Sequence, residues 1–192
     1  MELFLISLVS YLLGSIPFGF LLTKLFLSKD IRNIGSGNIG TTNVLRTGNK
    51  KIGYSTLLLD ILKAIIIVIF IKFNYPEFIF ISALCVFLGH VFPIWLKFKG
   101  GKGIATYIGI LFCINLNYGL VFIITWLIVF LIFKYSSLSS IVAALSIPLY
   151  LFIFLNSIDL FFFIIMFILI FFTHRENIRR LINKEESKTK IY

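Results

Sequence analysis

The chain has 192 residues, of which 59% are hydrophobic and 23 are phenylalanine. A water-soluble domain of this length has too little interior to bury so many apolar side chains, so the composition predicts helices that cross a bilayer. The formal net charge of +10 would suit nucleic acid, but no basic helix face accompanies it. Basic residues beside membrane segments explain the charge better, and we expect membrane lipids, not nucleic acid, as partners.

Apolar segments separated by polar stretches predict an all-α, polytopic membrane protein with a single transmembrane domain, residues 1–192. In chain order we expect membrane helices at Leu3–Leu27, Ser55–Phe73, Phe78–Leu96, Ile104–Ile114, Tyr118–Phe133, Leu138–Leu155 and Ile158–Phe172. Most connections between them are short: Asn74–Glu77, Asn115–Asn117 and Asn156–Ser157. Residues 104–133 leave two alternatives open. One helix would run roughly 45 Å, too long for a straight span, whereas two helices make the first unusually short.

The positions of the basic residues favour two helices there. With seven spans and the N-terminus outside, the cytoplasmic side receives loops 28–54, 97–103 and 134–137 and the tail 174–192, which together are rich in Lys and Arg. The outer connections then contain no Lys or Arg, and their charged residues are only Glu77 and Asp159. Lys72 lies near an outer helix end. Six spans would place the basic tail outside, against the positive-inside rule. We therefore predict seven transmembrane helices, one of them short, and a cytoplasmic C-terminus.

The loop at 28–54 contains a glycine-rich segment, IGSGNIGTTNVLR at residues 34–46, which we call the first glycine loop. Its G-x-G-x-x-G pattern is not a dinucleotide site, because a membrane helix precedes it where a strand is needed. Glycines still let backbone N–H groups approach an anion, and an arginine can hold a phosphate through two parallel hydrogen bonds. The candidate phosphate ligands are Ser36, Gly37, Asn38, Thr41, Asn43 and Arg46. The alternative is a flexible connection between helices.

A second glycine-rich segment, KFKGGKG at residues 97–103, precedes an apolar helix, and we call it the second glycine loop. It lacks the first glycine of a P-loop, and Lys102 is followed by Gly103 instead of Ser or Thr, which argues against an ATPase. Gly101 and Lys102 could still form an anion site at the start of a helix. The alternative is a set of lysines that extend to the membrane interface. Nearby, His90 is either a base or a hydrogen-bonded packing residue.

Two further groups are candidates. In the tail, His174 and Asn177 would share one face of a helix, although a basic tail is also typical of an electrostatic anchor on anionic lipid. Asp60 and Lys63 lie within an apolar helix at positions i and i+3. Charges inside a membrane segment favour a functional role, but a neighbouring pair of opposite sign can simply neutralise itself. Both interpretations of the pair stay open.

The three segments around Gly35–Arg46, Gly89–Thr106 and His174–Leu181 resemble the three motifs of the bacterial acyl-phosphate:glycerol-3-phosphate acyltransferases (PlsY type), in order, in spacing and in chain length. The resemblance implies a seven-helix enzyme of the bacterial inner (plasma) membrane whose active site faces the cytoplasm. It would move a fatty acyl group from acyl phosphate to the 1-hydroxyl of glycerol 3-phosphate, giving lysophosphatidic acid and phosphate, the first step of phospholipid synthesis. The functional partner would be the enzyme that makes acyl phosphate.

The resemblance also implies which residues hold the phosphates: Ser36, Arg46, Lys102, His174 and Asn177, with Ser139 a weaker candidate. Thr41 stands where alanine is usual in the family, and its hydroxyl adds a donor. Acyl phosphate is already activated, so we expect no cofactor and no metal. A catalytic base is not evident: His90 and His174 are candidates, and a phosphate oxygen of the donor is the alternative.

The competing interpretation is a transporter of a phosphorylated solute. The sequence has no inverted repeat, and its polar donors lie at one membrane face, whereas transporters bind near the midplane. We therefore expect three cytoplasmic segments that together form one phosphate-binding pocket.

Overall fold

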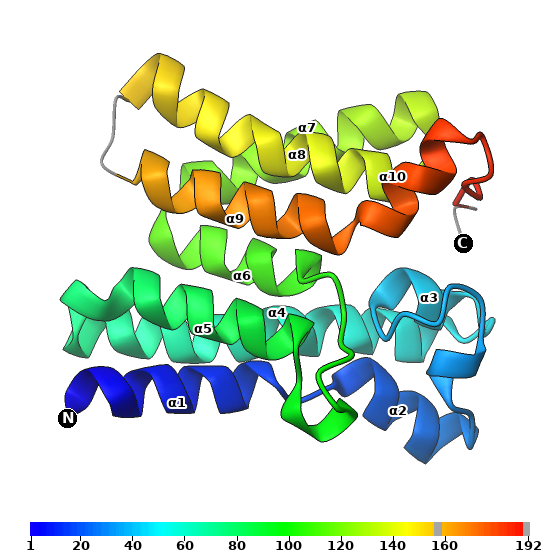
Figure 1. Cartoon of the computed structure of the whole chain (residues 1–192), viewed down its shortest axis with the longest axis horizontal. Helices are drawn as coiled ribbons and strands as arrows, with labels where there is room; N and C mark the ends of the chain where they lie inside the picture. The colour runs from blue at the N-terminus through cyan, green and yellow to red at the C-terminus, as the bar shows by residue number, and fades with distance from the viewer. Residues whose placement is uncertain (156–158, 190–192) are drawn as a thin grey trace. The chain divides into compact units, whose positions relative to one another are not determined.

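The computed structural model describes residues 1–155 and 159–189, and these contain helices, turns and loops but no strand (Figure 1). The α-helices are α1 (Glu2–Gly14), α2 (Phe18–Leu27), α3 (Thr41–Leu45), α4 (Lys50–Asn74), α5 (Ile79–Val91), α6 (Ile104–Ile114), α7 (Leu116–Phe133), α8 (Ser136–Tyr150), α9 (Leu160–Thr173) and α10 (Arg175–Ile182). The shorter turns are η1 (Ile31–Asn33), η2 (Pro76–Phe78), η3 (Ile94–Leu96) and the π-helical η4 (Leu151–Leu155). The predicted connection Asn156–Ser157 and the last tail residues, 190–192, lie outside the described residues.

The chain forms two compact units, Met1–Ile114 and Asn115–Tyr192. In the first unit α4 packs against α1, α2, α3, α5 and α6, and α1 packs along α5. In the second unit α8 lies between α7 and α9, and α10 contacts both α8 and α9 (Figure 1). The all-helical prediction is confirmed, whereas the single domain predicted from chain length stays a prediction.

By length and composition, four stretches of the described helices could cross a membrane: Glu2–Leu27, Pro76–Leu96, Leu116–Phe133 and Ser136–Leu155. Helices α9 and α10, bent by 62° at His174, would together make a fifth, and the apolar helix α6 is shorter. Large apolar side chains lie exposed on these stretches, for example Phe26, Leu131 and Phe161, as lipid contact requires. The count of seven spans and the outer position of the N-terminus stay predictions.

The first predicted segment, Leu3–Leu27, is not one continuous helix. It divides into α1 and α2 at Ser15–Pro17. Pro17 has no N–H to donate, and proline disfavours helical geometry at the residue before it, here Ile16. The division leaves the carbonyl of Ile16 outside the regular helical hydrogen bonds, and this carbonyl accepts a hydrogen bond from Phe18 N at 3.2 Å.

The prediction of two helices within residues 104–133 is confirmed. The side chain of Asn115 accepts a hydrogen bond from the backbone N–H of Asn117 at 2.9 Å, which caps α7. At the end of α6 the ammonium of Lys72 donates to the carbonyls of Cys113 at 2.7 Å and Ile114 at 3.2 Å. These contacts satisfy carbonyls that the end of a helix leaves without a partner.

Two predicted loops are shorter than expected, because helices begin earlier in the chain. The loop 28–54 ends at Asn49, whose side chain accepts a hydrogen bond from Ile52 N at 3.0 Å and so starts α4. The loop 134–137 is reduced to two residues, since α8 begins at Ser136. In both cases a polar residue counted as loop belongs to the first turn of a helix.

Candidate active site

Asn43 organises the first glycine loop. Its side chain is 3% exposed, and its amide nitrogen lies within hydrogen-bonding distance of the carbonyls of Ile31 at 3.2 Å, Ile34 at 2.8 Å and Asn38 at 2.8 Å. Its amide oxygen accepts a hydrogen bond from Ser36 N at 3.0 Å. The donors and acceptor of Asn43 therefore bind the loop itself, and this residue holds the loop in shape.

The glycines of this loop shape the chain more than they supply donors. Gly35 and Gly37 have φ of +55° and +70°, the left-handed region that glycine adopts without steric cost. The N–H of Gly37 donates to Ile34 O at 2.9 Å, and the N–H of Gly40 donates to Asn38 Oδ1 at 2.8 Å. These two N–H groups are engaged within the loop, and the binding of an anion by the loop stays a prediction.

The side chains of the first glycine loop include groups that could bind a ligand. Ser36 and Arg46 are exposed, and Asn38 and Thr41 are half-buried. A Cβ at Gly35 would contact Asn43 Oδ1 and would lie 3.2 Å from Arg46 Nη1, so glycine leaves room for the guanidinium beside the loop. Among the described residues, Thr41 Oγ1 is buried without a hydrogen-bond partner. The loop therefore presents one cation and several neutral donors from a firmly bonded backbone.

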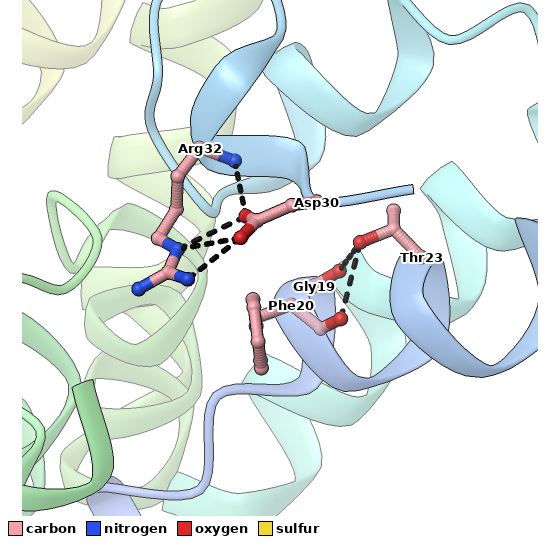
Figure 2. A network of polar contacts seen from close by, with 5 residues as sticks. All are labelled: Gly19, Phe20, Thr23, Asp30 and Arg32. Carbon is pink, nitrogen blue, oxygen red and sulfur yellow. Dashed lines mark hydrogen bonds and ion pairs between the residues drawn. The ribbon is translucent and has the colours of Figure 1, made fainter. Parts of the chain in front are cut away.

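A charged pair fixes the start of this loop. Figure 2 shows Arg32 bonded to Asp30, with Nη2 2.6 Å from Oδ2 and Nε 2.9 Å from Oδ1, while its guanidinium lies 4.8 Å from the centre of the Phe20 ring. On α2, the helix that carries Phe20, Thr23 donates its hydroxyl hydrogen to the carbonyl of Gly19. The hydrogen bond from the Arg32 side chain lowers the pKa of Asp30 from 3.8 to about 2. Arg32 is therefore engaged within the protein by Asp30.

The second glycine loop packs against the end of α5. The N–H of Gly100 donates to Val91 O at 3.0 Å, and the N–H of Gly101 donates to His90 O at 3.1 Å. A Cβ at Gly101 would collide with His90 Nε2, and one at Gly103 would collide with the Phe87 ring. These glycines permit close packing, and their amides are already used. Lys102, half-buried just before α6, is the cationic side chain that the loop adds.

The predicted charge pair proves to be part of a larger buried group. Asp60 Oδ1 lies 2.8 Å from Lys63 Nζ and 3.5 Å from His90 Nδ1. Lys63 Nζ also lies 2.9 Å from His90 Nδ1 and 3.0 Å from the carbonyl oxygen of Ile16. The three titratable residues are each at most 5% exposed. The sequence indicated the pair and the histidine separately but not that they meet.

In the second unit, the tail residues His174 and Asn177 are 2% and 4% exposed. His174 Nδ1 lies 2.8 Å from Ile170 O; since a carbonyl only accepts, Nδ1 carries the hydrogen. The Asn177 amide donates to Glu186 Oε1 at 2.7 Å. Ser139, also fully buried, donates to Tyr135 O at 2.8 Å.

Glu186 is the residue that sequence reasoning missed. Ser137 Oγ donates to Oε1 at 2.8 Å, and Arg180 Nε donates to Oε2 at 2.6 Å, in addition to the amide of Asn177. The carboxylate thus joins the tail after α10 to the starts of α8 and α10. The available signal was an acidic residue within a basic tail, but its distance from Ser137 along the chain concealed the contact.

The sequence candidates therefore lie in both units. Ser36, Gly37, Asn38, Thr41, Asn43, Arg46, Gly101 and Lys102 belong to the first unit, and Ser139, His174 and Asn177 belong to the second. That they share one pocket stays a prediction. No cluster of His, Cys, Asp and Glu in the described part of the chain could hold a metal ion.

Comparisons with known proteins agree on one family. A family model described as glycerol-3-phosphate acyltransferase matches residues 4–184. A glycerol-3-phosphate acyltransferase of Pelagibacter ubique (strain HTCC1062) is 69% identical over 192 residues, covering all of both chains. A crystal structure of PlsY, an integral membrane glycerol 3-phosphate acyltransferase, in its glycerol 3-phosphate form is 38% identical, with a TM-score of 0.92 over 99% of this chain and 96% of that one. Its lysophosphatidic acid form is 36% identical, with a TM-score of 0.88 over 98% and 95% of the two chains. With its apolar helices, the present chain is accordingly a multi-pass membrane protein.

The Glu186 contacts predict acid sensitivity of the second unit. Burial raises the pKa of Glu186, but the hydrogen bonds from Arg180, Asn177 and Ser137 outweigh it and hold the pKa below its ordinary value of 4.5. A lowered pKa in the folded state means that this contribution to stability is complete above pH 4.5 and is lost as the pH falls through the folded pKa. Thermal unfolding in detergent should therefore show Glu186→Gln less stable than the wild type at pH 7, with the difference shrinking below pH 4.5. Glu185→Gln, at an exposed position, is the control; a difference that does not change with pH would contradict the interpretation.

Proposed function

This chain belongs to the glycerol-3-phosphate acyltransferase family, and from that premise we propose that it transfers a fatty acyl group from acyl phosphate to the 1-hydroxyl of glycerol 3-phosphate. The products are lysophosphatidic acid and inorganic phosphate. Two similar solved structures support glycerol 3-phosphate as the acceptor and lysophosphatidic acid as the product, because they are the glycerol 3-phosphate form and the lysophosphatidic acid form of PlsY.

One observation carries the assignment of the phosphate-binding groups. In the first glycine loop, an exposed arginine stands beside a backbone whose polar groups are bonded within the loop. Because such a loop is already ordered, binding of phosphate by Arg46 costs little conformational entropy. A guanidinium can bind two phosphate oxygens at once. We assign Arg46 and Lys102 the phosphate charges and Ser36, Asn38 and Thr41 the neutral hydrogen bonds. Gly37, Asn43 and Gly101 hold the two loops in shape.

The chemistry requires positioning and charge stabilisation. The hydroxyl oxygen on carbon 1 of glycerol 3-phosphate bonds to the acyl carbon, the bond from that carbon to the phosphate oxygen breaks, and phosphate leaves with the electron pair. Arg46 and Lys102 stabilise negative charge on the phosphate groups while the tetrahedral intermediate forms. No cofactor is needed for these steps, because the anhydride is already activated.

The hydroxyl proton passes to a phosphate oxygen of the donor. The two histidines differ: His90 Nδ1 faces the ammonium of Lys63, whereas His174 donates its Nδ1 hydrogen to the Ile170 carbonyl, so Nε2 is the nitrogen of His174 that could accept a proton. In the second unit we propose His174, Asn177 and Ser139 as anion-binding groups. A His174→Gln variant that lost turnover together with a pKa near neutrality in its pH–rate profile would assign the proton to His174 instead.

The cellular setting is part of the proposal. The basic residues of loops 28–54 and 97–103 and of the tail support a cytoplasmic location for these segments, at the bacterial inner membrane. Glycerol 3-phosphate would enter from the cytoplasm, and acyl phosphate would arrive through the membrane from the enzyme that makes it. The product, which has one acyl chain and a phosphate, would remain at the interface.

Arg46→Lys tests the phosphate grip. A lysine keeps the charge but cannot make two parallel bonds, and a hydrogen bond to a charged group is worth about 1.5–3 kcal/mol. We expect kcat/KM for glycerol 3-phosphate to fall roughly tenfold to a hundredfold. Arg32→Lys is the matched control, since its guanidinium is bound to Asp30 and a lysine can keep that ion pair. Equal kinetics for the two variants would refute the role of Arg46.

The donor is tested with purified protein in detergent. Acyl phosphate with glycerol 3-phosphate should release inorganic phosphate and form lysophosphatidic acid in equal amounts, and acyl-CoA should not replace the donor. Turnover with acyl-CoA and none with acyl phosphate would overturn the proposed donor while leaving the family assignment intact.

A further inference from the structure

A buried group of charged residues lies in the first unit beside the second glycine loop. Lys63, on α4, is the centre of this group. Its ammonium lies 2.8 Å from Asp60 Oδ1, 2.9 Å from His90 Nδ1 and 3.0 Å from Ile16 O. Neutralisation of Lys63 would need only Asp60, one helical turn away. The contacts with α5 and with the break between α1 and α2 need a further explanation.

The imidazole of His90 faces both charged residues through Nδ1, with Lys63 Nζ at 2.9 Å and Asp60 Oδ1 at 3.5 Å. A charged Lys63 only donates hydrogen bonds; beside it Nδ1 accepts and the ring hydrogen lies on Nε2. Nε2 is the ring atom against which Gly101 packs, because a Cβ there would collide with it. The main chain of His90 also accepts the N–H of Gly101 at 3.1 Å. The second glycine loop is thus held to His90 by both its backbone and its ring.

The contact between Lys63 and Ile16 acts on the first glycine loop. Ile16 is the residue before Pro17, where α1 ends and α2 is about to begin. The bond to its carbonyl ties Lys63 to the turn that precedes α2. On α2, Gly19 packs so closely on the first glycine loop that a Cβ would collide with the carbonyl oxygen of Ile39. One ammonium group therefore touches the supports of both loops.

We propose that Asp60, Lys63 and His90 form a positioning group that holds the two glycine loops in the arrangement in which Arg46 and Lys102 bind phosphate. None of the three touches substrate. The proposal rests on the proposed function, in which the loops bind glycerol 3-phosphate and acyl phosphate. It assigns His90 a role as a support for Gly101, in place of the catalytic base considered from the sequence.

The test removes the charges together. A single substitution would leave a buried charge without its partner and could prevent folding, whereas replacing both members of a buried ion pair is often tolerated. For Asp60→Asn/Lys63→Met we expect the KM for glycerol 3-phosphate to rise about tenfold to a hundredfold, as small misplacements of binding groups do, with kcat changed much less. Lys72→Met is the matched control: it is also on α4, but its ammonium caps the end of α6, so its KM should not change.

A folded double variant with unchanged KM would overturn the proposal, and so would a loss of kcat at unchanged KM, which would give the group a chemical step. The same assay distinguishes a failure of the proposed function, because the wild type would then form no lysophosphatidic acid from acyl phosphate and glycerol 3-phosphate. If only the positioning group fails, the wild type turns over, Arg46→Lys lowers kcat/KM and the double variant leaves KM unchanged.

A second measurement keeps the proposal testable if the double variant does not fold. Gly101→Ala would push a methyl group into the His90 ring, so its effect on KM should shrink in a His90→Ala background, where the ring is absent. This double-mutant cycle measures the coupling between the two residues directly. Effects that simply add would show that Gly101 does not act through His90, and would overturn the proposal.

Discussion

The structure depends on one constraint: buried irregular backbone must find hydrogen-bond partners within the protein, because a buried N–H or C=O group without a partner costs free energy. Both glycine loops meet it through specific neighbours. Asn43 binds backbone groups of the first loop from within, and the carbonyls of His90 and Val91 bind the second loop from the end of α5. The same constraint applies at the break between α1 and α2, where a buried ammonium reaches the carbonyl of Ile16.

This constraint changes what the glycines contribute. In soluble nest sites, successive N–H groups bind the anion directly. Here the N–H groups of Gly37, Gly40, Gly100 and Gly101 are used to fold the loops. The left-handed or tightly packed positions favour glycine, and in the proposed function the side chains of the loops bind phosphate. Rigid loops of this kind keep cationic groups in place before substrate arrives, which lowers the entropic cost of binding.

Local signals in the sequence predicted much of the fold. The Asn115–Asn117 segment marked the break between α6 and α7, since an asparagine side chain caps a helix start. The extents of α7 and α9 followed from apolar segments. The division at Pro17 was missed, although proline was visible, because the whole of Leu3–Leu27 is apolar enough for one span. Local composition cannot decide between a kink and a break when neighbouring helices supply the hydrogen bonds.

For the candidate site, too, the sequence predicted some residues and missed some contacts. Residue types and spacing indicated Arg46, Lys102 and the Asp60–Lys63 pair. They could not indicate that Lys63 meets His90 and Ile16, that Asn43 is used within its loop, or that Glu186 binds Asn177. Each of these contacts joins residues that are distant along the chain or uses a group that looks available for ligand.

The central claim, that the first glycine loop is a preformed phosphate-binding surface, is tested most directly by thiol labelling. In a chain with Cys85→Ser and Cys113→Ala, a single cysteine at the exposed position Asn33, next to the loop, is labelled with a maleimide with and without glycerol 3-phosphate. A cysteine at Glu77, an exposed residue of η2 just after the end of α4, serves as the reference. We expect glycerol 3-phosphate to slow labelling at position 33 and to leave the rate at position 77 unchanged. Equal rates at position 33 in saturating glycerol 3-phosphate would contradict the claim.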